Sequence, residues 1–423
     1  MSIIHDALKK VEKERADTQE PRSPTPQLPR TPSQYQLPSY PHFGKEGKPQ
    51  GSGVIKEGEV SSSPLTGKKG GGFSLHLPSL SLSKNLLGVD IGSSSIKLVH
   101  LACTGGACRL KDVGYLKLPY GAGESGAAEA LKTLLNVHGI GKSRVSSSIR
   151  NKSLTFSYIK LPKMPKADLT EAVRWEVKKG IDFPEDAIID YVVIDELMEE
   201  GKTKLSIMTF AVRKDEVMGH VGMLKEASLI PDVIDVGPMA LLSAFDYNYG
   251  WEKDKRYAVL DIGASKATLS IISNGSLRFA RYIPLAGDDI TRIIQDAEGT
   301  DFQAAEDKKL RYAGVNDAPE VVQTAVKSFT EGISIEAKRS FTYYQAHLRE
   351  GWVDSLLLSG GSANIKGLAE KIGSAVGVPT AIYDSMKGVE VKRAMPRGTD
   401  INRLSLSPIL VEAFGLALRR EGE

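Results

Sequence analysis

A duplicated pattern limits the folds that this sequence can adopt. An apolar strand pattern ends in Asp-Ile-Gly, passes through a short polar turn and returns as a second apolar strand. The pattern occurs as GVDIGSSSIK around Asp90 and again as AVLDIGASKAT around Asp261. Repetition of such a unit, each time followed by further strands and helices, indicates that a half-domain has been duplicated. The sequence therefore predicts two similar α/β lobes.

Strand and helix patterns alternate on both sides of the duplication. The segment 153–230 interrupts the first half with the order strand, helix, strand, strand, helix, which predicts an inserted small α+β subdomain. We assign 85–152 and 231–252 to the first lobe. We assign 253–423 to the second lobe, which we expect the apolar helix PILVEAFGLALRR to close as a core helix.

The first 84 residues differ from the rest in composition. Ten of the 21 prolines lie between Pro21 and Pro78, together with many glycines and serines. Such a segment buries too little apolar surface to offset its ordering entropy, so 17–84 is predicted to be a disordered linker. Residues 1–16 are predicted to form an amphipathic docking helix whose partner the sequence does not identify. One face of that helix would carry Ile3, Ile4, Ala7, Leu8 and Val11.

Charge and composition give no support to several classes of protein. The net charge is +3, and the excess positive charge lies in the linker, so the lobes carry no strong basic signal for nucleic acid. No run of about 18 apolar residues suggests a membrane span, and MSIIHDALKK lacks the apolar core of a signal peptide. The two cysteines, Cys103 and Cys108, cannot build a disulfide framework. No second pair accompanies them, which argues against a metal site, and we expect a strand cysteine beside a turn cysteine. These features favour a cytoplasmic protein.

Each copy of the duplicated turn carries groups suited to phosphate. A strand delivers an aspartate to its carboxyl end, a glycine permits a tight turn, and consecutive backbone N–H groups can then cradle a phosphate. The carboxylates can hold a hydrated Mg²⁺ through water. For one copy alone an ordinary turn is the better interpretation, but the duplication favours phosphate binding between two turns. The residues concerned are Asp90, Gly92, Ser93, Ser94 and Ser95, and Asp261, Gly263, Ala264 and Ser265.

Two further elements suit a nucleoside. In LLLSGGSANIKGL a buried strand ends in Gly360 and Gly361, where backbone without side chains can approach a flat ligand. A tight strand-to-helix turn explains these glycines equally well. In SIEAKRSFTYY, Glu336 and Arg339 share one helical face and could contact ribose and adenine. Their alternative is an exposed ion pair of little energetic value.

The order of these motifs resembles the actin-like (ribonuclease H-like) ATPase superfamily. Within it, the stretch from Leu86 to Arg420 most resembles the PilM family of type IV pilus assembly proteins, and the insertion is similar to that of PilM and of the related division protein FtsA. The resemblance implies a site for ATP and Mg²⁺. Its expected residues are Asp90, Gly92, Ser93, Ser94, Ser95, Lys97, Asp261, Gly263, Ala264, Ser265, Gly287, Glu336, Arg339, Gly360 and Gly361, with Mg²⁺ held by Asp90 and Asp261 through water.

The chain departs from the family pattern at two positions. Lys266 stands where a small or polar residue is more usual, and Gly287 is followed by Asp288 instead of a second small or polar residue. Both departures bear on nucleotide turnover more than on the fold. We therefore expect ATP binding with at most slow hydrolysis.

The resemblance also implies partners. The PilM family binds the short cytoplasmic N-terminal peptide of the inner-membrane protein PilN in a groove between the first lobe and the insertion, and it communicates with the assembly motor ATPases. This favours a cytoplasmic adaptor that contacts the inner membrane only through proteins, in a pilus or a related secretion machine. The alternatives are a small-molecule kinase and a filament-forming division ATPase. A kinase needs a general-base Asp in its cleft, and RNKSLTFSY offers none after the fourth strand.

Overall fold

The structure is a computed structural model of the chain. It describes residues 84–104, 107–149, 153–199, 201–315, 317–348, 350–391 and 403–419. The predicted docking helix 1–16 and nearly all of the predicted linker 17–84 lie outside these residues. Among the residues that the structure describes, none of the helices combines the length and apolar character needed to cross a membrane.

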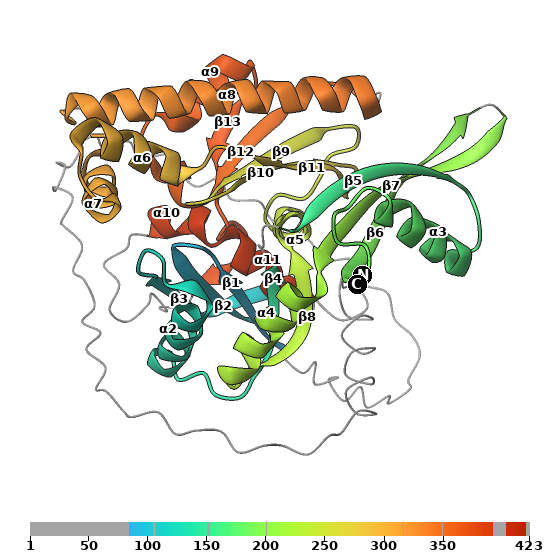
Figure 1. Cartoon of the computed structure of the whole chain (residues 1–423), viewed down its shortest axis with the longest axis horizontal. Helices are drawn as coiled ribbons and strands as arrows, with labels where there is room; N and C mark the ends of the chain where they lie inside the picture. Colours follow the sequence, from blue (N-terminus) through green and yellow to red (C-terminus); the bar gives the residue numbers. More distant parts are fainter. Residues whose placement is uncertain are drawn as a thin grey trace, which may run out of the picture. The chain divides into compact units, whose positions relative to one another are not determined.

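The first lobe is built on a six-stranded sheet with the strand order β14-β3-β2-β1-β4-β8 (Figure 1). Its strands are β1 (Lys84–Ile91), β2 (Ser95–Thr104), β3 (Ala107–Lys117), β4 (Arg144–Ile149), β8 (Ile230–Val236) and β14 (Glu390–Val391). The first three strands form an antiparallel meander, while β4 runs parallel to β1. Helices α2 (Gly123–Val137), α4 (Lys214–Glu226) and α5 (Gly237–Asn248) supply side chains to the same core.

The second lobe repeats this plan in a five-stranded sheet, β11-β10-β9-β12-β13. Its strands are β9 (Arg256–Ile262), β10 (Ala267–Ser273), β11 (Ser276–Ile283), β12 (Ser355–Ser359) and β13 (Thr380–Ile382). As in the first lobe, a meander carries the Asp-Ile-Gly motif on its first strand, and a parallel strand pairs with that strand. The helices are α6 (Gly287–Glu298), α7 (Phe302–Tyr312), α8 (Glu320–Leu348) and α9 (Leu368–Val376), with the short helix η1 (Gly361–Asn364) after β12.

The insertion contains a three-stranded antiparallel sheet, β5-β7-β6, and helix α3. These elements are β5 (Thr155–Pro162), α3 (Lys166–Lys178), β6 (Ala187–Glu199) and β7 (Lys202–Arg213). A small core of its own joins α3 to the sheet through Leu169, Val173 and Val177. Helix α4, which the sequence assigned to the insertion, instead buries Val217 and Val221 in the core of the first lobe.

The closing helix differs from its expected position. After α10 (Arg403–Leu406) and η2 (Ser407–Ile409), helix α11 (Val411–Leu418) packs against α5, β1, β2 and β4 of the first lobe and does not close the second. The approach is very close, because a Cβ on Gly415 would lie 1.8 Å from the carbonyl oxygen of Ala240. The helix is apolar nearly all round because it is buried between α5 and the first sheet.

The two cysteines also differ from the expectation. Cys103 and Cys108 face each other across the antiparallel pair β2–β3 and form a disulfide. Both cysteines belong to the buried core, and the hydroxyl of Tyr247 accepts a hydrogen bond from the backbone N–H of Cys108 at 2.9 Å.

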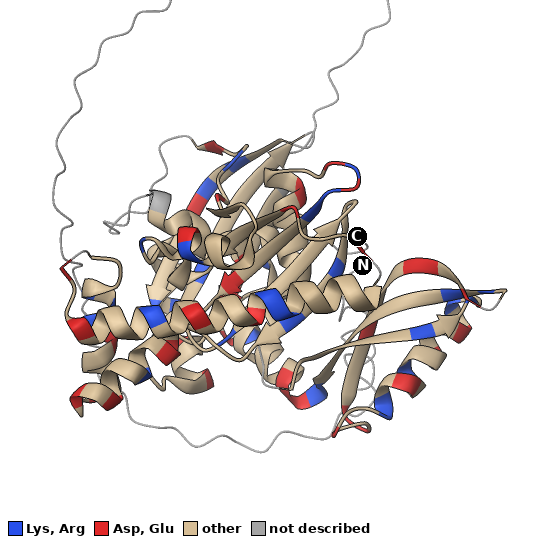
Figure 2. Ribbon diagram, turned by 90° about the horizontal axis from the view of Figure 1, so that it is seen from above, with Lys and Arg blue, Asp and Glu red and all other residues tan. Residues whose placement is uncertain are grey.

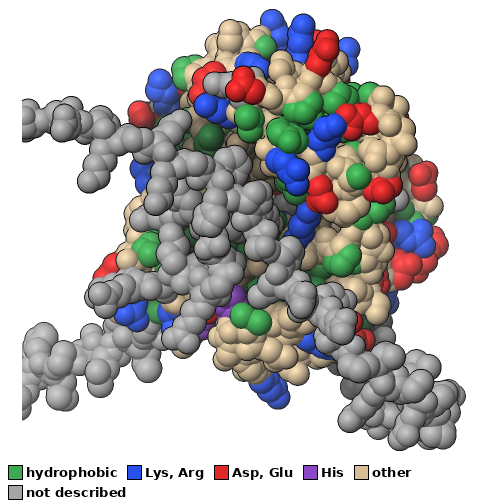
Figure 3. Space-filling view, turned by 90° about the vertical axis from the view of Figure 1, so that its left-hand side faces the viewer, with side chains coloured by type: hydrophobic (Ala, Val, Ile, Leu, Met, Phe, Trp, Pro, Cys, Tyr) green, Lys and Arg blue, Asp and Glu red, His purple; other side chains and the backbone are tan. Residues whose placement is uncertain are grey.

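Charged side chains of both signs are mixed over the described surface. Blue and red bands alternate along α8 in Figure 2. On the face seen in Figure 3, hydrophobic side chains lie among charged ones wherever grey atoms do not cover it. Neither view shows a broad basic face of the kind that binds nucleic acid.

Candidate functional site: two aspartate turns and the elements around them

The first turn holds its aspartate in a buried ion pair. Asp90, at the end of β1, is 2% exposed. Lys97 lies directly opposite it on β2, with its Nζ 3.1 Å from Asp90 Oδ2. The turn between the strands closes with a hydrogen bond from the N–H of Gly92 to the carbonyl of Ser95 at 3.0 Å.

The second turn has the same backbone geometry and a different partner for its aspartate. The N–H of Gly263 donates to the carbonyl of Lys266 at 3.0 Å, which repeats the hydrogen bond of the first turn. Asp261, 6% exposed, accepts a hydrogen bond from the hydroxyl of Ser359 at 3.0 Å. Thr268 lies opposite Asp261, at the position that Lys97 has in the first copy. The first carboxylate is thus held by a cation and the second by a hydroxyl.

The structure brings three predicted glycines to the second turn. The N–H of Gly287, at the start of α6, donates to the carbonyl of Gly263 at 3.0 Å. Because β9 and β12 are parallel, Ser359 lies beside Asp261, and the chain continues into Gly360 and Gly361. Gly360 has φ +86°, and a Cβ there would lie 2.4 Å from the carbonyl oxygen of Ile262. No other residue type permits this approach.

A buried lysine beside Gly287 was missed by sequence reasoning. Lys309 on α7 is 7% exposed, and its ammonium donates to the carbonyl of Gly287 at 3.0 Å and to the hydroxyl of Thr291 at 2.8 Å. Glu306, one turn earlier, lies 2.6 Å from the same ammonium. A buried charge costs free energy unless it is paired, and this pair lies directly behind the glycine that contacts the second turn. The sequence signal was Glu-x-x-Lys in AEDKK.

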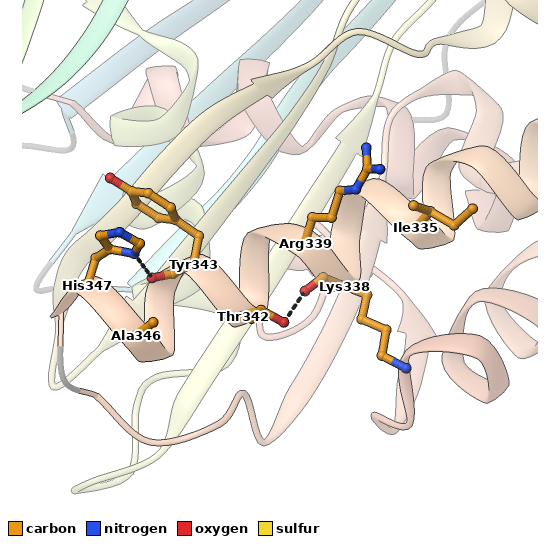
Figure 4. Close-up of a pocket in the computed structure, with 7 residues that line it drawn as sticks. All are labelled: Ile335, Lys338, Arg339, Thr342, Tyr343, Ala346 and His347. Carbon is orange, nitrogen blue, oxygen red and sulfur yellow. Dashed lines mark hydrogen bonds between the residues drawn. The ribbon is translucent and has the colours of Figure 1, made fainter.

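The predicted Glu336–Arg339 pair lies in a different group of residues. Glu336 binds Arg339 at 2.6 Å and also Arg281, on the edge strand β11, at 2.9 Å. Arg339 itself lines an open groove of about 490 Å³ along α8 with Ile335, Lys338, Thr342, Tyr343, Ala346 and His347. In Figure 4, Arg339 and Lys338 point in different directions from this helix. The contacts of Glu336 therefore connect it to β11 and not to the glycines.

A small cavity lies where the two lobes meet. Its lining comes from both sides of the duplication: Asp261, Lys266, Thr268 and Tyr282 from the second lobe, and Gly237, Pro238, Leu241 and Glu412 from helices α5 and α11. Glu412 is 3% exposed and accepts a hydrogen bond from the hydroxyl of Ser148 on β4 at 2.5 Å. The volume is only about 20 Å³, enough for about one water molecule.

A second buried group missed from the sequence lies near the first turn. His220 on α4 makes a 2.9 Å hydrogen bond between its Nε2 and the hydroxyl of Ser147. Burial lowers the pKa of His220 to about 4, although the nearby charge of Asp90 acts to raise it. The imidazole is therefore neutral at physiological pH.

The predicted residues thus fall into three groups. The first turn holds Asp90, Gly92, Ser93, Ser94, Ser95 and Lys97; the second brings Asp261, Gly263, Ala264, Ser265, Gly287, Gly360 and Gly361 together; Glu336 and Arg339 lie on α8. Within the described ranges, no cluster of three or more His, Cys, Asp or Glu side chains is arranged to hold a metal ion directly. Mg²⁺ bound through water needs no such cluster.

Comparison with known proteins identifies similar chains. A family model described as type IV pilus assembly protein PilM matches residues 88–421. A solved structure described as a PilM-PilN type IV pilus biogenesis complex matches with a TM-score of 0.69 and 28% sequence identity, over 79% of this chain and 97% of that chain. These matches confirm the resemblance and the duplicated actin-like α/β fold class.

Cell division proteins match over shorter parts of the chain. FtsA of Pseudomonas aeruginosa is 29% identical over 160 residues, which are 33% of this chain and 38% of that protein. FtsA of Bacillus subtilis is 32% identical over 111 residues, which are 25% of this chain and 24% of that protein. The matched regions span less than half the length of either relative.

Proposed function

Since the chain belongs to the type IV pilus assembly protein PilM family, we propose that it is an ATP-binding adaptor of a type IV pilus or related secretion machine. The observation that carries ATP binding is the repeated turn: two strands each deliver a buried aspartate to a turn closed by the same hydrogen bond. Two such turns can hold a run of phosphates between them, through backbone N–H groups and hydroxyls.

The second turn would hold most of the nucleotide. Gly361 leaves backbone open to a ligand beside this turn, because nothing lies within 4 Å of a Cβ added there, whereas Gly287 and Gly360 pack closely against protein atoms. The Glu306–Lys309 pair would face the ribose from behind Gly287. We propose this role for Glu306 and Lys309 in place of Glu336 and Arg339, because Lys309 contacts Gly287 whereas Glu336 binds Arg281.

Mg²⁺ fits this arrangement through water. The ion prefers one or two carboxylates plus waters and phosphates, and Asp90 and Asp261 are the two carboxylates directly before the turns. When bound, it would neutralise phosphate charge. Lys97 and the hydroxyl of Ser359 hold these carboxylates in place. A carboxylate fixed in this way is a poor general base, so we expect at most slow hydrolysis.

Nucleotide entry requires the lobes to separate. Pockets for ligands of this size occupy about 300–1,000 Å³, whereas the cavity between the lobes is about 20 Å³. We therefore infer that ATP binds to an arrangement with more space between the lobes.

The proposed partners follow from the family. The matched solved structure is a PilM-PilN complex, which supports binding of the cytoplasmic N-terminal peptide of a PilN-like inner-membrane protein between the first lobe and the insertion. We further propose that the chain links this protein to the assembly motor ATPases. It would then lie in the cytoplasm and reach the inner membrane only through proteins.

Thermal unfolding with and without ATP and Mg²⁺ tests the nucleotide proposal. At a hundredfold excess over Kd, ligand binding stabilises the folded state by about 2.7 kcal/mol, so the melting temperature is expected to rise by several degrees. Asp261→Asn keeps the shape of the side chain and should remove most of the rise, while the exposed control Asp182→Asn should retain it. No rise in the unchanged protein would refute ATP binding.

The FtsA relatives favour a second candidate, a filament-forming ATPase on the same fold. Sedimentation with and without ATP separates the two functions. A pellet that grows with ATP and with protein concentration would support filaments, while a protein that stays in the supernatant and binds a PilN-like peptide would support the adaptor.

A further inference from the structure

Lys266 lies in the cavity between the lobes, in the turn that carries Asp261. Its side chain lines the cavity with Asp261 and Thr268. Its Nζ lies 4.7 Å from the ring centroid of Tyr282, which is within cation–π distance. A cationic side chain at the end of a phosphate-type turn is thus held against an aromatic ring on β11.

The same ring contacts the inserted subdomain. The Tyr282 ring lies 4.8 Å from the ring of Phe156 on β5. Phe156 in turn packs edge-on against Phe210 of β7, at 5.6 Å between centroids. One aromatic ring, Tyr282, therefore connects the turn of the second lobe to Phe156 on β5 of the insertion.

Hydrogen bonds and an ion pair also join the insertion to β11. The hydroxyl of Tyr158 on β5 accepts a hydrogen bond from the N–H of Ala280 at 2.7 Å and donates to its carbonyl at 3.1 Å. Arg278 on β11 binds Asp195 of β6 at 3.0 Å and Glu350 at 2.6 Å. These contacts hold the insertion against β11 at Ala280 and Arg278. A movement of the Tyr282 side chain on β11 would therefore act on β5, which lies next to it.

We propose that Lys266 is a phosphate-binding residue and that it couples nucleotide occupancy to the inserted subdomain through Tyr282 and Phe156. This inference rests on the proposed ATP binding. Without nucleotide, the ammonium lies over the Tyr282 ring. With ATP, the ammonium forms a charge-assisted hydrogen bond to a phosphate oxygen, the stronger class of hydrogen bond. Lys266 then leaves the ring, and Tyr282 packs differently against Phe156.

Two states of one side chain supply the coupling. A ligand shifts an equilibrium only as far as it binds one state better than the other. Here the phosphate provides that difference, because it contacts Lys266 only when the ammonium has left the ring. The partner surface of the insertion would thereby sense whether ATP is bound.

Amide hydrogen exchange of the full chain, with and without saturating ATP and Mg²⁺, tests this coupling. In the unchanged protein, ATP should speed exchange in β5 around Phe156 by about fivefold or more, the lower range of allosteric coupling. Lys266→Thr should bind ATP more weakly and, once saturated, show no such change. Lys387→Thr is the matched control, because Lys387 lies 4.2 Å over Tyr249 outside the cavity, and it should respond as the unchanged protein does.

A second variant keeps the test independent of Lys266 itself. Tyr282→Leu retains the phosphate contact and removes the ring, so ATP should still raise the melting temperature while β5 no longer responds. Exchange in β5 that is unaffected by bound ATP in the unchanged protein, or a response that persists in Lys266→Thr, would overturn the coupling and leave ATP binding intact. Failure of ATP to bind the unchanged protein would overturn both.

Discussion

Lys309 and Arg339 have the same spacing from a preceding glutamate, and they differ in burial. Glu306–Lys309 and Glu336–Arg339 both have the i, i+3 spacing of a helical ion pair. Lys309 is buried against Gly287, whereas the side chain of Arg339 is 69% exposed. Sequence spacing cannot distinguish these cases, because it reports the face that two residues share and not what lies against that face.

The stability of the protein should depend on the protonation of His220. Burial lowers its pKa to about 4 from the ordinary 6.5. The unfolded chain therefore binds a proton at His220 more readily than the folded chain does. The stability that the neutral, buried imidazole contributes is complete above pH 6.5 and is lost as the pH falls towards 4. At pH 5 the loss is about 2 kcal/mol.

Urea unfolding at pH 7 and pH 5 measures this loss. His220→Gln should reduce the difference between the two pH values, and His347→Gln, at an exposed histidine of α8, should leave it unchanged. An equal pH dependence in the unchanged protein and in His220→Gln would contradict the assignment.

Gly415 should tolerate no side chain. A Cβ there would lie 1.8 Å from the carbonyl oxygen of Ala240, so Gly415→Ala must push α11 away from α5. Overpacking of this kind costs about 1–3 kcal/mol or more, which denaturant unfolding would detect. Gly141→Ala, where nothing lies within 4 Å of the added methyl group, is the control and should unfold within about 0.5 kcal/mol of the unchanged protein.

Elements formed by local pairing were predictable, and elements formed by distant pairing were not. The two meanders follow from strand patterns joined by short turns, and the structure confirms both. The return of α11 and β14 to the first sheet depends on contacts with residues far away in the chain. An apolar helix pattern indicates burial but does not say in which lobe.

The hydroxyl of Tyr158 joins β5 of the insertion to the backbone of Ala280 on β11. Tyr158→Phe removes the only described side-chain partner of the Ala280 backbone groups and should cost about 1–3 kcal/mol, because buried polar groups lose their hydrogen bonds. Exchange of the Ala280 amide should become faster, and unfolding should shift to lower denaturant. Tyr343→Phe, on the exposed face of α8, should change neither, and an unchanged Ala280 amide in Tyr158→Phe would refute this role for the joint.

For the whole molecule, the lobes should be independent of the first 83 residues. Among the residues that the structure describes, the two large cores draw their side chains from residues 86–418. Deleting residues 1–83 should therefore leave the melting temperature within about 2 °C and preserve the response to ATP, since surface changes seldom exceed about 0.5 kcal/mol. Pull-down with and without this segment would identify its partner, and a truncated chain that fails to fold would show that part of the segment belongs to a core.

The position of α11 also determines when the first lobe can finish folding during synthesis. The first sheet begins at Lys84, but the helix between that sheet and α5 starts only at Val411. On a ribosome, where domains generally fold as they emerge, the amino-terminal lobe must wait until the entire second lobe has been synthesised. Until then the surface around Gly88, which α11 contacts in the complete fold, is left uncovered. A chaperone that binds the unfinished chain would bind at this exposed surface.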